Sequence, residues 1–159
     1  RGVALIPSGG CDMAIDQSRS WGQVLQSHMS KPGCCNARPD PVLLNKAVKA
    51  VCQMPRDFQE RGDVSMVTLF KESGYPQIAE SITEHLLEVY FEKHPDLIDA
   101  WVRNSEDTRG SPDWYLSKPT GSDKQWIVGF FPDGPTRRFS QRGQACAFYV
   151  KRYLETLRA

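Results

Sequence analysis

The segment just before the first expected strand carries the densest group of side chains that could do chemistry. The carboxylates Glu106, Asp107 and Asp113 flank Arg109, and Trp114 closes the segment. Neighbouring carboxylates can act as general acid and general base when their surroundings separate their pKa values. The same acidic and aromatic mixture is typical of a protein-binding surface, and a capped, solvated loop is the third interpretation.

A basic cluster follows the last turn signal of the chain. Arg137, Arg138 and Arg142 lie within six positions. Alternation along a strand would place Arg137 and Arg138 on opposite faces. We expect a local anion contact here, because the 20 Lys and Arg residues almost balance the 19 Asp and Glu residues and disfavour a nucleic-acid groove. The candidates for partner binding are therefore Glu106, Asp107, Arg109, Asp113, Trp114, Arg137 and Arg138.

The sequence contains no recognisable motif for binding a metal or a cofactor. None of the three histidines has a second histidine or a carboxylate at the spacing of a helical zinc site. His28, Cys34, Cys35 and Cys52 would be a four-ligand set, but adjacent cysteines rarely converge on one ion and the usual C-x-x-C is missing. We therefore expect no metal, no cofactor and no catalytic residue.

The five cysteines bear on the compartment. An odd number is awkward for a secreted disulfide framework and favours reduced thiols in the cytoplasm. Because the chain begins at Arg1, removal of a signal peptide would place the protein in the periplasm instead. A disulfide from Cys34 or Cys35 to Cys52 is the alternative for those thiols, whereas Cys146 lies in an apolar helical pattern and is predicted to be buried.

The length and the pattern of elements predict one α+β domain that spans residues 1–159. No apolar run approaches the roughly 18 residues needed to cross a bilayer. Residues 1–40 indicate an irregular N-terminal wrap, residues 41–110 a helical region, and residues 111–159 a β-meander followed by a C-terminal helix. We expect the helical region to pack on a small three-stranded antiparallel meander.

Capping residues set the expected helix boundaries. Asp40 is a good N-cap and Pro41 suits the first turn, so a helix begins there and is expected to end before Pro55. A second helix is expected from near Asp63 to Gly74, a residue that suits a left-handed C-terminal cap.

Three short segments near the C-terminus have the composition of strands. They are Trp114–Leu116, Gln125–Phe131 and Thr136–Phe139, rich in aromatic and β-branched residues and separated by turn signals. The middle segment is apolar on both faces, which predicts a central strand. A last helix, from about Ser140 to Leu157, is expected to cover one face of the sheet.

The second half of the chain resembles a known group of proteins. The motifs SEDTRGSPDWYL, QWIVGFF, PDGPTRRFS and QACAFYVKRYLETL are similar to segments of small, mostly uncharacterised bacterial proteins, some of the toxin-immunity kind. The resemblance begins near Ser81 and covers the C-terminal half to two-thirds of the chain. It implies a binding protein that occludes the active site of a toxin, without catalytic residues.

These observations lead to three functional hypotheses. The first is a non-enzymatic protein-binding module, in the specific form of an immunity-type inhibitor of a toxin or effector. Its partner would be basic if the carboxylates matter, because complementary charges speed encounter. The second is a small hydrolase or nuclease-like effector domain that uses the carboxylates between Glu106 and Asp113. The third is a regulatory module of a larger protein.

Overall fold

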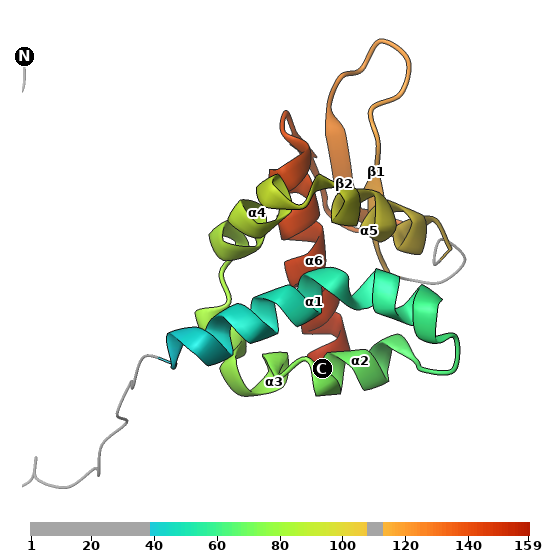
Figure 1. Ribbon diagram of the computed structural model, residues 1–159. Coiled ribbons are helices and arrows are strands. Elements are labelled where there is room, and N and C mark those ends of the chain that lie inside the picture. Colours follow the sequence, from blue (N-terminus) through green and yellow to red (C-terminus); the bar gives the residue numbers. More distant parts are fainter. Residues whose placement is uncertain (1–38, 108–112) are drawn as a thin grey trace, which may run out of the picture. The chain divides into compact units, whose positions relative to one another are not determined.

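The computed structural model describes residues 39–107 and 113–159, which belong to a compact unit that begins at residue 37 (Figure 1). The unit has an α+β fold with helices first, a small sheet next and a long helix last, which confirms the predicted class. Most of the expected N-terminal wrap, residues 1–38, lies outside the described residues. The elements are α1 (Pro41–Arg61), α2 (Met66–Glu72), α3 (Tyr75–Ile78), the 3-10 helix η1 (Ala79–Ser81), α4 (Glu84–Lys93), α5 (Pro95–Asp107), β1 (Trp114–Ser117), β2 (Trp126–Phe130), β3 (Thr136–Phe139) and α6 (Arg142–Arg158).

Helix α1 begins as predicted but does not end where the sequence indicates. The Val42 amide donates to the Asp40 carboxylate at 2.9 Å, so Asp40 caps the helix. The prediction of an end before Pro55 is wrong, because α1 continues through this buried proline to Arg61. An interior proline costs about 3 kcal/mol through its missing N–H and its ring. The buried face of α1, which runs from Ala47 to Pro55 itself, offsets that cost.

Helix α2 begins at Met66, three residues later than expected. The Ser65 hydroxyl accepts a hydrogen bond from the Thr68 amide at 3.1 Å, which makes Ser65 the N-cap and corrects the predicted start near Asp63. Gly74 has φ +76° and separates α2 from α3, so its left-handed conformation is confirmed.

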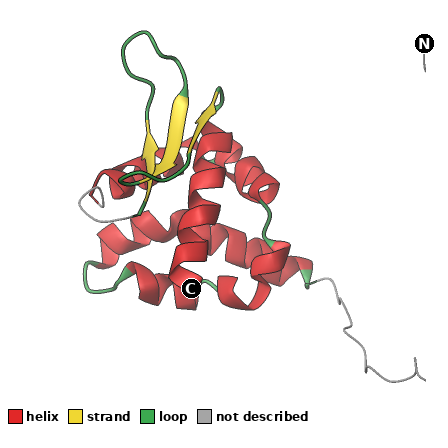
Figure 2. Ribbon diagram, turned by 180° about the vertical axis from the view of Figure 1, so that it is seen from behind, coloured by secondary structure: helices red, strands yellow, loops and turns green. Residues whose placement is uncertain are grey.

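The sheet is a three-stranded antiparallel meander with β2 in the centre, as predicted (Figure 2). Leu116 of β1 lies opposite Val128 of β2, and Val128 lies opposite Arg137 of β3. Trp114 and Phe139 share this face by alternation, and the rings of both contact a phenylalanine of α6. The face that carries Leu116 and Val128 therefore packs on α6.

Helix α6 runs through the middle of the unit and contacts α4, α5 and all three strands (Figure 1). Most of its residues are buried, including Ala145, Cys146, Tyr149, Val150 and Leu154. This confirms the prediction that the last helix covers one face of the sheet. Across residues 39–107 and 113–159, no helix has the length and apolar character that spanning a membrane requires.

The outer edge of β1 is closed by a side chain of α5. The Leu116 amide donates to the Ser105 hydroxyl at 2.7 Å, and this hydroxyl lies 3.4 Å from the Leu116 carbonyl, to which it donates. Both residues are fully buried. Because an uncovered strand edge leaves backbone groups without partners, Ser105 supplies what a fourth strand would otherwise provide.

The two cysteines within the described ranges are buried free thiols. Cys52 on α1 and Cys146 on α6 have no exposed surface, and burial raises the pKa of each thiol well above its usual range. Cys34 and Cys35 lie outside the described residues. Because Cys52 is a free thiol in this structure, the structure does not support the predicted disulfide from Cys34 or Cys35 to Cys52.

Candidate partner-binding groove

A groove of about 500 Å³ opens where the first and third strands meet α6. Its lining combines two arginines with two aromatic rings, and we call it the arginine–aromatic groove. The lining residues are Trp114, Pro135, Thr136, Arg137, Phe148 and Arg152.

Aromatic rings form the apolar part of the groove. Trp114 meets Phe148 edge to face, with ring centroids 6.0 Å apart, and meets Phe130 in the same way at 5.6 Å. Phe139 packs against Phe148 from the β3 side, at 5.4 Å. Trp114 is half-buried, whereas Phe148 is only 7% exposed. The rings therefore make a firm surface with one accessible aromatic side chain.

Arg137 is held on this surface by its aromatic neighbours. Its guanidinium carbon lies 5.1 Å from the ring centroids of both Phe139 and Phe148, within the range of a cation–π contact. The side chain is exposed and makes no ion pair within the described part of the chain. Since a guanidinium has five N–H donors, Arg137 can present several of them to a ligand.

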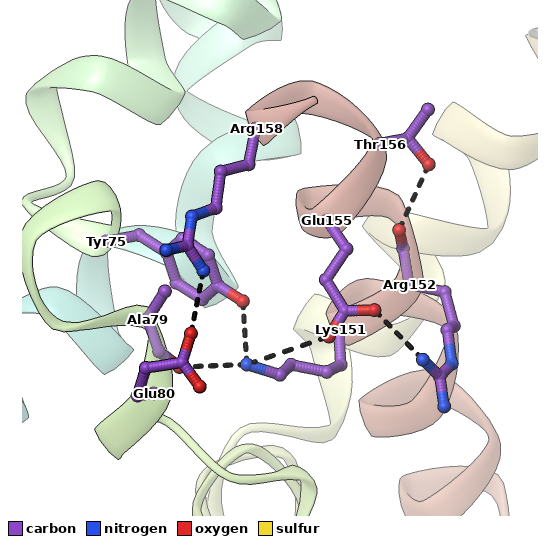
Figure 3. Close-up of polar contacts among 8 residues, drawn as sticks. All are labelled: Tyr75, Ala79, Glu80, Lys151, Arg152, Glu155, Thr156 and Arg158. Carbon is purple, nitrogen blue, oxygen red and sulfur yellow. Dashed lines mark hydrogen bonds and ion pairs between the residues drawn. The ribbon is translucent and has the colours of Figure 1, made fainter.

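Arg152 places a second guanidinium on the same ring. Its guanidinium carbon lies 5.1 Å from the Phe148 centroid. Arg152 also forms an ion pair with Glu155, at 2.9 Å, which orients the side chain along α6 (Figure 3). Two arginines thus share one aromatic ring, and within the described ranges Arg152 pairs with a carboxylate whereas Arg137 does not.

The neighbouring Lys151 fixes the C-terminal half of α6 against α3 and η1. Its amino group donates to the Tyr75 hydroxyl and to the Ala79 carbonyl, both at 2.9 Å (Figure 3). The Lys151 side chain is only 16% exposed, and Glu155 lies 4.0 Å from its amino group. Glu155 therefore links Lys151 to Arg152, one of the two arginines of the groove.

The structure brings two of the candidate binding residues, Trp114 and Arg137, into the groove and leaves others elsewhere. Arg138 projects from the opposite face of β3, as strand alternation predicts, and forms an ion pair with Asp123. Arg137 and Arg138 therefore do not make one basic cluster.

The acidic candidates are spread over the connection between α5 and β1. Glu106 is exposed near the end of α5. Asp113 is half-buried and accepts a hydrogen bond from the Trp114 amide at 2.7 Å. Burial raises the pKa of Asp113, and the Trp114 amide offsets part of that shift. Arg109 and the Asp107 side chain lie outside what the structure describes, so convergence of these groups stays a prediction.

A buried polar cluster beside the start of β1 was not predicted. The Tyr149 hydroxyl and the Asn104 amide nitrogen are buried, and the side chains of Asn104 and Ser105 lie close enough to Tyr149 to lower its pKa slightly. Burial raises the pKa of Tyr149 well above its usual range, and the adjacent Tyr153 adds to the effect. Burial likewise raises the pKa of Tyr153 to about 12. These side chains lie on apolar helix faces, so their sequence pattern indicates only a core.

The other groove residues were also missed by sequence reasoning. Phe148 and Arg152 are four residues apart on α6 and therefore share a face of the helix. That spacing is a signal, but it does not show which strand lies opposite. The arginine of β3 that completes the site is more than ten residues away in the chain.

The described unit is thus an α+β fold that carries an open arginine–aromatic groove. Across the two described ranges, no group of three histidine, cysteine or carboxylate side chains is placed to hold a metal ion. Comparison of the chain with protein-family models, with curated proteins and with solved structures found no match.

Proposed function

We propose that this protein acts without catalysis, by binding a partner protein through the arginine–aromatic groove. The observation that carries the proposal is Arg137. Its exposed guanidinium is positioned by two phenylalanine rings and, within the described residues, has no carboxylate partner. A charge positioned in this way is available for a ligand.

The composition of the groove supports a protein partner. Tryptophan and arginine are the side chains most enriched among residues that dominate binding energy at protein interfaces. Trp114 is half-buried and packs against the rings of Phe130 and Phe148. A partner can therefore cover Trp114 without first ordering a flexible side chain.

The open rim also favours a protein over a small metabolite. Pro135, Thr136 and Arg137 are all exposed along one side of the groove. A small-molecule pocket buries most of its ligand, whereas an open groove encloses only part of one. A side chain projecting from a larger partner fits such a groove better.

The sequence resemblance gives the proposal its specific form. An immunity-type inhibitor would use this surface to cover the active site of a toxin. The partner would then be the toxin or effector itself, and the groove residues would contribute contacts rather than chemical steps.

A site-specific crosslink in the full chain tests the proposal. A photoreactive residue in place of Thr136, at the exposed rim, is introduced into the original protein and into an Arg137→Gln, Arg152→Gln variant. We expect a discrete crosslinked protein in the source lysate, lost in the double variant and retained in Arg138→Gln. Arg138 is a matched control because it adjoins Arg137 on β3 and projects from the opposite face.

Two results would contradict the proposal. One is crosslinking that the groove substitutions leave unchanged. The other is no crosslinked protein from a chain whose circular dichroism shows a native fold.

A further inference from the structure

We infer that the groove receives an acidic segment of the partner, in which a carboxylate side chain neighbours an apolar or aromatic one. This inference rests on the proposed function and adds to it the chemistry of the partner.

Positive charge is in excess at the Phe148 ring. The guanidinium carbons of Arg137 and Arg152 both lie 5.1 Å from the Phe148 centroid, so they cannot be farther apart than twice that distance. Within the described ranges, Glu155 forms an ion pair with Arg152, and no carboxylate forms one with Arg137. A carboxylate from a partner would accept hydrogen bonds from Arg137, which has no carboxylate partner within the described ranges.

Carboxylates that line a neighbouring hollow do not pair with the Arg137 guanidinium. A second hollow on the other side of Arg137 is lined by Glu84, His85 and Glu88. Glu88 lies 3.8 Å from His85, and neither glutamate forms an ion pair with Arg137. These carboxylates disfavour an anion in the second hollow. The acidic group of the partner therefore enters on the Trp114 side.

Apolar side chains lie beside these positive charges. Trp114, Pro135 and Phe148 line the same groove as the guanidinium groups. An isolated carboxylate would leave those surfaces exposed to water, whereas an adjacent apolar side chain would cover them. The groove therefore fits a carboxylate and an apolar side chain together.

The inference reverses the charge expected for the partner from the sequence. A basic partner was expected from the carboxylates around Glu106 and Asp113, but neither residue lines the groove. The charges that do line it are both positive.

Titration of the full, isotope-labelled chain with short blocked peptides tests this chemistry. The probe is acetyl-Gly-Glu-Phe-Gly-amide, and the matched probes carry Gln or Lys in place of Glu. The readouts are the side-chain N–H resonances of Trp114, Arg137 and Arg152 in NMR spectra. We expect saturable shifts with the Glu peptide and binding about fivefold weaker with the Gln peptide, as for one exposed ion pair. The Lys peptide is expected to bind more weakly still.

Variants show which residues carry the effect. Arg137→Gln is expected to remove the difference between the Glu and Gln peptides, and Arg138→Gln is expected to leave it intact. Arg137→Lys keeps the charge but loses the planar donor group, so an intermediate difference is expected. Unchanged backbone spectra in these variants establish that the fold is retained.

Several outcomes would overturn the inference. The first two are equal binding of the Glu and Gln peptides and stronger binding of the Lys peptide. The third is no saturable shift up to ~10 mM peptide, because a site that weak does not matter for ordinary interfaces. The fourth is binding of inorganic phosphate that equals binding of the Glu peptide. The last would indicate a general anion site. Groove-dependent crosslinking combined with any of these would preserve the proposed function and refute only the acidic segment, whereas loss of groove-dependent crosslinking refutes the proposed function itself.

Discussion

The indole nitrogen of Trp101 on α5 donates a hydrogen bond to the backbone carbonyl of Cys52 on α1, at 3.1 Å. The accepting carbonyl lies three residues before Pro55, in the turn where a proline disturbs helical hydrogen bonding. Trp101 is fully buried and also packs edge to face against Tyr149 and Tyr153. One side chain thus supports the disturbed turn of α1 and fills the core against α6.

Replacing Trp101 with phenylalanine is expected to destabilise the protein by about 2 to 4 kcal/mol. The variant loses the hydrogen bond to Cys52 and leaves unfilled space in the core. Urea unfolding followed by circular dichroism measures the change. Trp126→Phe, at a half-buried position of the sheet, serves as the control and should cost less. Equal costs for the two substitutions would contradict the supporting role of Trp101.

Removal of the Ser105 hydroxyl is expected to open the edge of β1. Ser105→Ala deprives the buried amide and carbonyl of Leu116 of their side-chain partner, at a cost of about 1 to 3 kcal/mol. The Leu116 amide should then exchange its hydrogen faster with solvent. Ser117→Ala is the comparison, because Ser117 is the half-buried residue that follows Leu116 on β1 and its hydroxyl donates to the Lys118 carbonyl instead. Unaltered exchange at Leu116 would show that the hydroxyl does not protect the edge.

Gly129 and Tyr115 form a cross-strand pair in which the ring occupies the place of a side chain. A Cβ at Gly129 would lie 2.6 Å from the Tyr115 hydroxyl oxygen, so Gly129→Ala must displace the ring. We expect a loss of about 1 to 2 kcal/mol. The loss should be smaller when Tyr115 is already alanine, because the clash is then absent. A double-mutant cycle by denaturant unfolding measures this coupling, and strict additivity would refute the pairing.

Asp113 is expected to make stability fall as the pH rises. Burial raises its pKa in the folded state, so the folded chain binds this proton more tightly than the unfolded chain. Stability is therefore lost from the ordinary aspartate pKa of about 4 upward, until the folded-state pKa is passed. Asp113→Asn retains an acceptor for the Trp114 amide and should flatten this dependence, as measured by unfolding free energies across the acidic range.

Asp123 provides a control of opposite sign. The Gln125 amide, and then Arg138, hold the pKa of Asp123 below its usual range. Its contribution is present above the unfolded-state pKa and is lost as the pH falls through the folded-state pKa. Asp123→Asn should therefore reduce stability at neutral pH more than at low pH. The same trend in both variants would contradict the assignment for Asp113.

Lys151→Met is expected to loosen the contact between α6 and α3. The substitution removes the donor from the fully buried Tyr75 and from the Ala79 carbonyl, which should cost about 1 to 3 kcal/mol. Arg158→Gln, which breaks an exposed ion pair with Glu80, should change stability little. Thermal unfolding compares the two, and a larger effect at Arg158 would be the contrary result.

The sequence predicted helices and strands correctly where a capping residue or the local composition determines them. Asp40 begins α1 because its carboxylate reaches a free backbone amide two residues on, an interaction within one turn. The central position of β2 followed from apolar residues on both faces. Pro55 was misjudged because a local rule ends a helix at proline, whereas the buried face of α1 is stabilised by residues distant in the chain.

The sequence by itself determined the α+β class, the meander and the alternation that separates Arg137 from Arg138, since each depends on neighbours in the chain. Only the tertiary structure decided that Arg137 meets Phe148 and Arg152, because the packing of α6 on the sheet brings together side chains from separate elements. Such packing depends on the shapes of whole buried faces, and no short stretch of sequence encodes it.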